Sequence, residues 1–137
     1  MIAQPAMQTQ KEQRVNWIGF LYIALTIAFT VYGQMVIKWQ VNQAGTFPPE
    51  TGEKILFIIK LLLTPWVISS FASAFIASLF WMAAMTQFDI SFAYPFMSLS
   101  YVIVMVLSIV LMGEHFTWNK LAGTLVIIAG LFIVTRN

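Results

Sequence analysis

The chain has 137 residues, of which 60% are hydrophobic and only 9% are charged. Soluble domains carry roughly 25% charged residues, because a folded surface must be hydrated, so this composition excludes a soluble domain and a disordered chain. The basic residues are scattered singly, which excludes the clustered basic patch of a nucleic-acid-binding protein. Cysteine is absent, so disulfides and thiolate sites are excluded too. The composition indicates a membrane protein of one domain.

The first predicted elements are a polar tail over 1–14 and a single membrane domain over 15–137. The tail is expected to be disordered, and it lacks the apolar core and cleavage site of a signal peptide. A spanning helix needs about 20 apolar residues. The first such helix is predicted over 17–39, with a tryptophan at each end, as is typical of the aromatic belts at membrane surfaces.

The second apolar stretch, residues 55–85, is too long for one crossing. As a single helix it would reach about 46 Å, against a hydrocarbon core of about 30 Å. Pro65 disfavours helical geometry at the residue before it. The sequence therefore predicts an amphipathic helix over 54–63 that lies on the membrane, followed by a second span over 66–85. One long, tilted and kinked helix is the alternative.

Two further spans are predicted over 93–112 and 118–134, joined by a tight turn. The predicted fold class is therefore all-α: an integral membrane four-helix bundle, with an interfacial helix before the second span. Basic residues on the two sides of the membrane nearly balance. The positive-inside rule accordingly leaves both a fixed orientation and dual insertion open.

Small and polar side chains recur on one face of the second and third spans. The second span carries Ser70, Ser73, Ala74, Ala77, Ser78 and Trp81 on this face, and the third carries Tyr94, Ser98, Tyr101, Met105, Ser108 and Met112. Hydroxyl groups in hydrocarbon need partners, so the face of the third span is predicted to look into the bundle or a wet cavity. The small residues of the second span permit close helix contact and leave a space into which Trp81 is predicted to point. Bundle packing is the alternative for the serines, and an interfacial belt is the alternative for Tyr94. The candidate substrate contacts are Trp81, Tyr94, Ser98 and Tyr101.

Lys38 and Gln34 lie four residues apart on one face of the first span, near its end. An ammonium and an amide at this place can hold an anionic headgroup such as a phosphate. The alternative is that the lysine extends along the helix to place its charge among the lipid headgroups.

The remaining charges near the membrane lie at helix ends, where structural roles are expected. Asp89 is predicted to cap the third helix. Glu114 is predicted to pair with Lys120 across the short turn, or to accept a hydrogen bond from the first turn of the fourth helix. The single histidine, His115, has no companion ligands, so no metal site is predicted.

The fourth span carries a flat stripe of small residues, with Gly123 and Gly130 seven positions apart and Ala122 and Ala129 beside them. Such a stripe favours close helix–helix contact in lipid. We predict that Gly123 and Gly130 lie at a dimer contact, with a second copy of the chain or with a similar four-helix subunit.

Several short motifs follow one another along the chain and together carry a family resemblance. They are Gly33-Gln34 with Lys38, Pro65-Trp66, Trp81, the run DISFAYP over 89–95, Ser98-Leu99, Tyr101-Val102, Gly113-Glu114, and Gly123 with Gly130. The series resembles the drug/metabolite transporter superfamily in its four-helix form, over nearly the whole chain after the tail. Two branches compete: small multidrug resistance exporters, and EamA-like proteins similar to subunits of the flippase for undecaprenyl-phosphate-linked aminoarabinose.

One position separates these branches. The small multidrug exporters carry an essential glutamate in the first helix at the position of Thr30, whereas the first span here contains no Asp or Glu. The resemblance therefore favours the flippase-like branch and implies that Lys38 and Gln34 hold a phosphate, while Trp81 and the polar face of the third span meet the headgroup.

The function that the resemblance implies is transport of a polyprenyl-phosphate lipid, carrying a sugar, across the bacterial inner membrane. The transporter is expected to be a homodimer or a heterodimer with a similar subunit. No cofactor, metal, nucleic-acid partner or enzyme activity is expected. The alternatives are an exporter of small amphipathic cations and a non-transporting partner subunit of a larger membrane complex.

Overall fold

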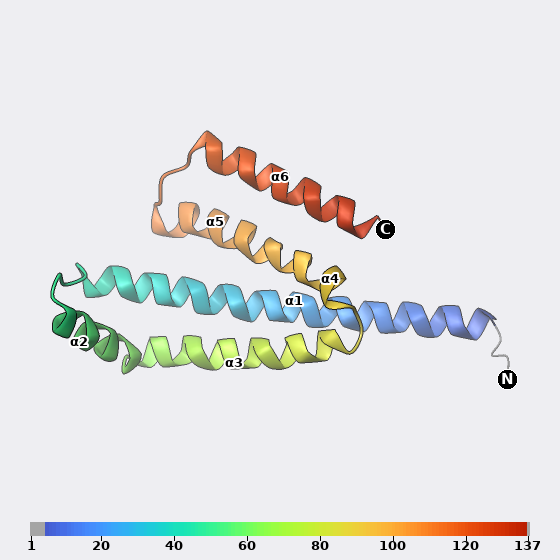
Figure 1. Cartoon of the computed structure of the whole chain (residues 1–137), viewed down its shortest axis with the longest axis horizontal. Helices are drawn as coiled ribbons and strands as arrows, with labels where there is room; N and C mark the ends of the chain where they lie inside the picture. The colour runs from blue at the N-terminus through green and yellow to red at the C-terminus, as the bar shows by residue number, and fades with distance from the viewer. Residues whose placement is uncertain (1–4, 137) are drawn as a thin grey trace.

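The computed structural model describes the backbone of residues 5–136 and the side chains of residues 17–136. Four helices are long and apolar enough to cross a membrane, and their spans are Trp17–Ala44, Pro65–Met85, Ile90–Met112 and Trp118–Thr135. They lie side by side along one long axis (Figure 1), and the described residues contain no β-strand. The predicted all-α membrane bundle is confirmed.

Helix α1, Pro5–Ala44, begins well before its apolar span. The prediction of a disordered tail is therefore wrong for residues 5–14, whereas residues 1–4 lie outside the described residues. No proline or glycine occurs between Pro5 and Gly19, so nothing in the backbone stops the helix from extending toward the N-terminus. At its other end α1 stops before Gly45, whose φ of 92° is left-handed.

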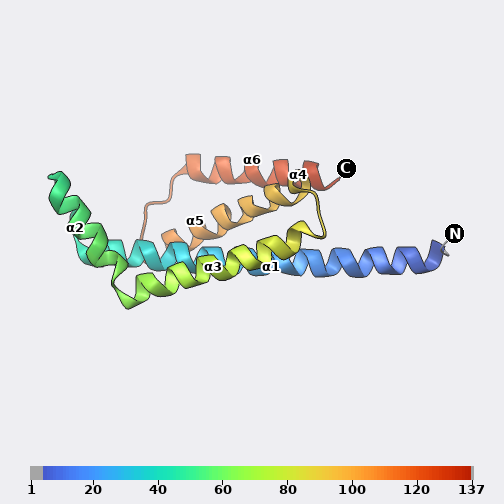
Figure 2. The same cartoon turned by 60° about the horizontal axis from the view of Figure 1, so that its bottom comes forward.

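The long apolar stretch is divided into two helices. Helix α2 covers Thr51–Leu62 and helix α3 covers Pro65–Met85. Thr64 between them is extended, with ψ of 131°, the geometry that a following proline favours. Pro65 takes the first helical position, where its missing N–H has no partner to lose. Helix α2 leaves the line of α3 at an angle (Figure 2), and none of its residues is buried.

The third span is not one continuous α-helix. It consists of α4 (Ile90–Ala93), the 3₁₀ helix η1 (Tyr94–Met97) and α5 (Ser98–Met112). Pro95 is the second residue of η1. It has no backbone N–H to donate, and in a regular α-helix its ring would clash with the carbonyl group of the preceding turn. The tighter 3₁₀ turn has three residues per turn, so α5 is rotated relative to the uninterrupted helix that the sequence predicts.

Helices α1 and α3 form the most closely packed pair, antiparallel and side by side (Figures 1 and 2). Small residues permit this approach, because a Cβ atom placed on Gly33 would lie 3.2 Å from the carbonyl oxygen of Ser70. A hydrogen bond also crosses the pair: Ser73 Oγ donates to the carbonyl oxygen of Phe29 at 2.6 Å. The two helices thus provide a fixed frame for the rest of the bundle.

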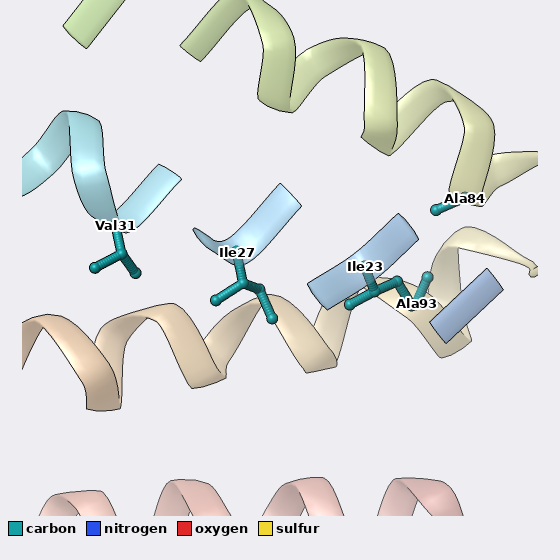
Figure 3. Packing of buried hydrophobic residues seen from close by; sticks show 5 residues of the cluster. All are labelled: Ile23, Ile27, Val31, Ala84 and Ala93. Atoms are coloured by element: carbon teal, nitrogen blue, oxygen red, sulfur yellow. The ribbon is translucent and has the colours of Figure 1, made fainter. Parts of the chain in front are cut away.

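A small apolar core connects α1 to the segment from the end of α3 to α5 (Figure 3). Its buried members are Ile23, Ile27, Val31, Ala84 and Ala93. The α3–α4 connection packs closely onto α1 at Gly19, where an added Cβ would lie 2.5 Å from the ring of Phe88. This contact fixes the start of the third span against the frame.

Helix α6, Trp118–Thr135, lies at the periphery of the four spans. It lies beside α5 and away from α3 (Figures 1 and 2). Thr117 caps its N-terminus by accepting a hydrogen bond from the backbone N–H of Lys120 at 3.2 Å. Thr124 is its single buried residue, so α6 is attached to the other helices through a small part of its surface.

Candidate functional site

A groove with a volume of about 900 Å³ lies between α1, α3 and the η1–α5 segment. Seven of its described lining residues carry hydroxyl groups and none is charged, while most of the exposed surface of the wall is apolar. The polar lining residues are Thr26, Thr30, Gln34, Ser70, Ser78, Tyr94, Ser98 and Ser100. A wall that combines apolar surface with hydroxyl groups suits a sugar ring, which has an apolar face and hydroxyl substituents.

Four of the six predicted substrate contacts line this groove: Gln34, Trp81, Tyr94 and Ser98. They come from α1, α3, η1 and α5 respectively. The rings of Trp81 and Tyr94 meet edge to face, with centroids 6.0 Å apart. This pair forms an aromatic wall at which a ligand ring can pack.

Tyr101 is outside the groove, and 63% of its surface is exposed. Its predicted place depended on regular α-helical spacing from Tyr94, which η1 interrupts. Across a 3₁₀ turn, residues three apart align, so Met97 and Ser100 follow Tyr94 into the groove. Sequence reasoning missed Ser100, although Pro95 was the signal for the change of register.

Hydroxyl groups of the groove are largely bonded to backbone carbonyl oxygens of their own spans. The side chains of Ser70, Ser98 and Ser100 each donate to the carbonyl oxygen three residues earlier at 2.6 Å. Ser78 and Thr26 donate to the carbonyl oxygen four residues earlier at 3.0 and 2.8 Å. Ser70 and Thr26 are buried, at 1% and 3% exposure, so the oxygens with lone pairs that a ligand can reach are those of Ser78, Ser98 and Ser100. The groove is therefore suited to a ligand rich in O–H and N–H donors.

Lys38 lies at the rim of the groove, one helical turn beyond Gln34 and next to the lining residue Ile37. Its Nζ is 3.8 Å from Oε1 of Glu114, and the two side chains are 50% and 38% exposed. This distance is too long for a hydrogen bond. Exposed ion pairs contribute about 0–1 kcal/mol, so the pair holds its two members only weakly.

The predicted pairing of Glu114 with Lys120 is wrong. Lys120 Nζ instead donates to the carbonyl oxygen of His115 at 2.7 Å, while Glu114 pairs with Lys38 across the bundle. The reason lies at Gly113, whose left-handed φ of 68° turns the chain sharply at the end of α5. This turn places the carboxylate beside α1, and Lys120 reaches back over the loop.

Asp89 occupies the predicted capping position before α4, but its side chain makes no capping hydrogen bond. Its carbonyl oxygen accepts from the N–H groups of Phe92 and Ala93 at 3.1 and 3.0 Å, so the backbone closes this turn. Among the residues that the structure describes, no three His, Cys, Asp or Glu side chains gather as metal ligands would.

The glycine stripe of α6 makes no close contact within the chain. A Cβ atom placed on Gly123 or on Gly130 would meet nothing within 4 Å. The stripe is therefore open along the described part of the chain, and its role in a dimer contact stays a prediction.

The sequence is similar to a transporter family and to several flippase subunits. Residues 12–136 match the EamA-like transporter family. The chain is 28% identical over 123 residues to a protein of Erwinia tasmaniensis named probable 4-amino-4-deoxy-L-arabinose-phosphoundecaprenol flippase subunit ArnF, and 32% identical over 123 residues to the subunit of the same name from Enterobacter sp. (strain 638). Each alignment covers 85% of this chain and 94% of the relative.

A subunit with a different name is similar as well. The chain is 28% identical over 117 residues to the probable flippase subunit ArnE of Aeromonas hydrophila, covering 85% of this chain and 96% of that protein. No solved structure matches the chain.

Proposed function

Because the chain belongs to the EamA-like transporter family, we propose that it is a subunit of a flippase that moves a polyprenyl-phosphate-linked sugar across the bacterial inner membrane. Its relatives are named as flippase subunits for a lipid of this kind, and its four apolar helices make it a multi-pass membrane protein. The observation that carries the proposal is the uncharged, hydroxyl-rich groove with a lysine at its rim.

The rim and the wall of the groove bind the headgroup in succession, because the 15 residues of α5, about 22 Å, separate Ser98 in the wall from Glu114 beside Lys38. At the rim, the phosphate binds the ammonium of Lys38 and the amide of Gln34, since a charged donor gives the stronger hydrogen bond. Further along the groove, sugar hydroxyls donate to the acceptor oxygens of Ser98 and Ser100, and the ring of Trp81 offers an apolar face to the sugar. The polyprenyl chain stays in the surrounding hydrocarbon.

The groove permits transport because its side chains replace the water that hydrogen-bonds to the headgroup. Moving a polar group from water into hydrocarbon without a hydrogen-bond partner costs about 2–7 kcal/mol of free energy. The groove supplies accessible acceptors for the sugar at Ser78, Ser98 and Ser100. It therefore lowers the barrier to crossing without any chemical step, and we assign no catalytic residue.

The groove disfavours the alternative function, export of small amphipathic cations. A lone cation in the membrane needs a free carboxylate partner, but none of the described lining residues is acidic, Thr30 lies in the wall, and the nearby carboxylate of Glu114 is already paired with Lys38. We expect no growth protection against quaternary ammonium compounds. A third function, that of a non-transporting partner subunit, predicts that the purified chain moves no lipid in any oligomeric form.

Translocation in proteoliposomes tests the proposal. The full chain is reconstituted alone and together with a similar four-helix subunit, and movement of a polyprenyl-phosphate-linked sugar is followed. Lys38→Ala removes a charge-assisted hydrogen bond and is expected to slow translocation by about tenfold or more. The matched control is Lys54→Ala, a lysine on α2 over the ring of Phe47 and outside the groove, which should leave the rate unchanged. An undiminished rate in Lys38→Ala would refute the role of Lys38.

A further inference from the structure

The carboxylate of Glu114 is held in place by an anchored loop. Gly113 turns the chain with a φ of 68°, and Lys120 Nζ donates to the carbonyl oxygen of His115 at 2.7 Å. Thr117 caps α6 at the far end of the same loop. The turn and the two bonds hold the backbone on both sides of Glu114, which keeps its side chain beside Lys38 at the rim of the groove.

Lys38 and Glu114 form the one salt bridge of the described residues. Their 3.8 Å separation and their exposure of 50% and 38% leave most of their bonding capacity unused. An ammonium has three donors, and a carboxylate has about four acceptor sites. The wall beside them carries no charge, so this pair supplies both the positive and the negative charge near the groove end.

We propose that Glu114 is the second half of the headgroup site and reads an ammonium group on the sugar. This inference rests on the proposed function. A zwitterionic headgroup, with one phosphate and one ammonium, replaces the single contact between Lys38 and Glu114 by two: phosphate with Lys38, and ammonium with Glu114. Every charge keeps a partner, which avoids the large cost of an unpaired one.

A headgroup with a phosphate alone fits this rim less well. Once its phosphate engages Lys38, the carboxylate of Glu114 is left without its cation and close to a second negative charge. Like charges brought together at a binding site oppose the wrong ligand. The arrangement therefore selects an amino sugar over a neutral one. The substrate named for the relatives, 4-amino-4-deoxy-L-arabinose-phosphoundecaprenol, contains both groups.

The alternative is a purely structural role, in which Glu114 holds the α5–α6 loop against α1. The two readings differ in what a charge reversal does. In the double variant Lys38→Glu with Glu114→Lys the salt bridge is restored and a structural tie survives. Affinity for the headgroup is lost in this variant, because the phosphate and the ammonium would each face a like charge.

Ligand binding by the full chain in detergent tests the inference separately from translocation. The probes are a short-chain polyprenyl phosphate carrying an aminoarabinose and its N-acetylated form, which keeps the sugar and removes the positive charge. The wild-type chain is expected to bind the free amine about tenfold more tightly, as one charge-assisted contact provides. Glu114→Gln should abolish this preference while still binding the N-acetylated lipid, which also shows that the variant is folded.

The matched control is Asp89→Asn, which removes a carboxylate from the α3–α4 connection, away from Lys38, and should keep the preference. The charge-reversed double variant should lose affinity for the free amine. The inference is overturned if Glu114→Gln keeps the preference, if the wild type shows none, or if the reversed variant binds normally. Binding of neither lipid by the wild type would instead refute the proposed function.

Discussion

The α1–α3 pair and helix α6 are held in the bundle in opposite ways. Between α1 and α3, Gly33 approaches the backbone of Ser70 and a hydrogen bond crosses to the carbonyl oxygen of Phe29. Helix α6 has one buried residue, Thr124, whose hydroxyl makes a cross-helix contact with the sulfur of Met105 at 3.1 Å. A Cβ atom placed on either of its glycines would meet nothing within 4 Å.

The α1–α3 pair therefore forms the frame of the bundle, whereas α6 leaves its glycine stripe uncovered. In lipid, helices associate through close van der Waals contact and hydrogen bonds, because hydrocarbon covers apolar side chains as well as another helix does. The α1–α3 pair uses both means within the chain. Helix α6 has the small residues for close contact but no helix against them, so we infer that its stripe is used between subunits.

The largest effect on the monomer is expected from Gly33→Leu. Its first side-chain atom would lie 3.2 Å from the carbonyl oxygen of Ser70, a backbone atom that cannot rotate away. Forcing extra atoms into a packed interface costs about 1–3 kcal/mol. Thermal unfolding in mild detergent should show a clear loss of stability. An unchanged unfolding temperature would contradict the close packing of this pair.

A smaller loss is expected from Ser73→Ala, which removes the 2.6 Å hydrogen bond to the carbonyl oxygen of Phe29. Side-chain hydrogen bonds between membrane helices contribute about 0.6 kcal/mol on average. Titration with a denaturing detergent can resolve this difference against Ser78→Ala, whose hydroxyl bonds only within α3. Equal stability of the two variants would show that the cross-helix bond does not hold the frame.

The smallest effect on the monomer is expected from Gly130→Leu, because no atom lies within 4 Å of the added Cβ. The monomer should insert and unfold as the wild type does. If the stripe lies at a dimer contact, the dimer should weaken, and crosslinking or native mass spectrometry in mild detergent would report it. A dimer of undiminished strength would place the contact elsewhere, and a monomer that is fully active alone in bilayers would remove the need for one.

Much of the fold could be predicted because its signals are local. Apolar length predicts the spans, and Pro65 predicts the break between α2 and α3. The helical extension over 5–14 could not be predicted from polarity, since a helix continues wherever no residue stops it. The register of the third span was also missed, because Pro95 produces a 3₁₀ turn rather than a simple helix start.

The site was predictable only in part, for a related reason. Spacing along one helix places Trp81 and Ser98 correctly in the groove wall. The partner of Glu114 depends on how the loop at Gly113 turns toward a helix far away in the sequence. Periodicity within a span contains no information on such a contact, so the sequence favours the neighbouring Lys120 over Lys38.

The lipid that co-purifies with the full chain tests the central claim most directly. Extraction in mild detergent and mass spectrometry should identify a polyprenyl-phosphate-linked sugar bound to the wild-type chain, and Lys38→Ala should lose most of it, while Lys54→Ala retains it. Bulk phospholipids alone on the wild-type chain, or the same polyprenyl lipid in equal amount on Lys38→Ala, would contradict a headgroup site in the groove with Lys38 at its rim.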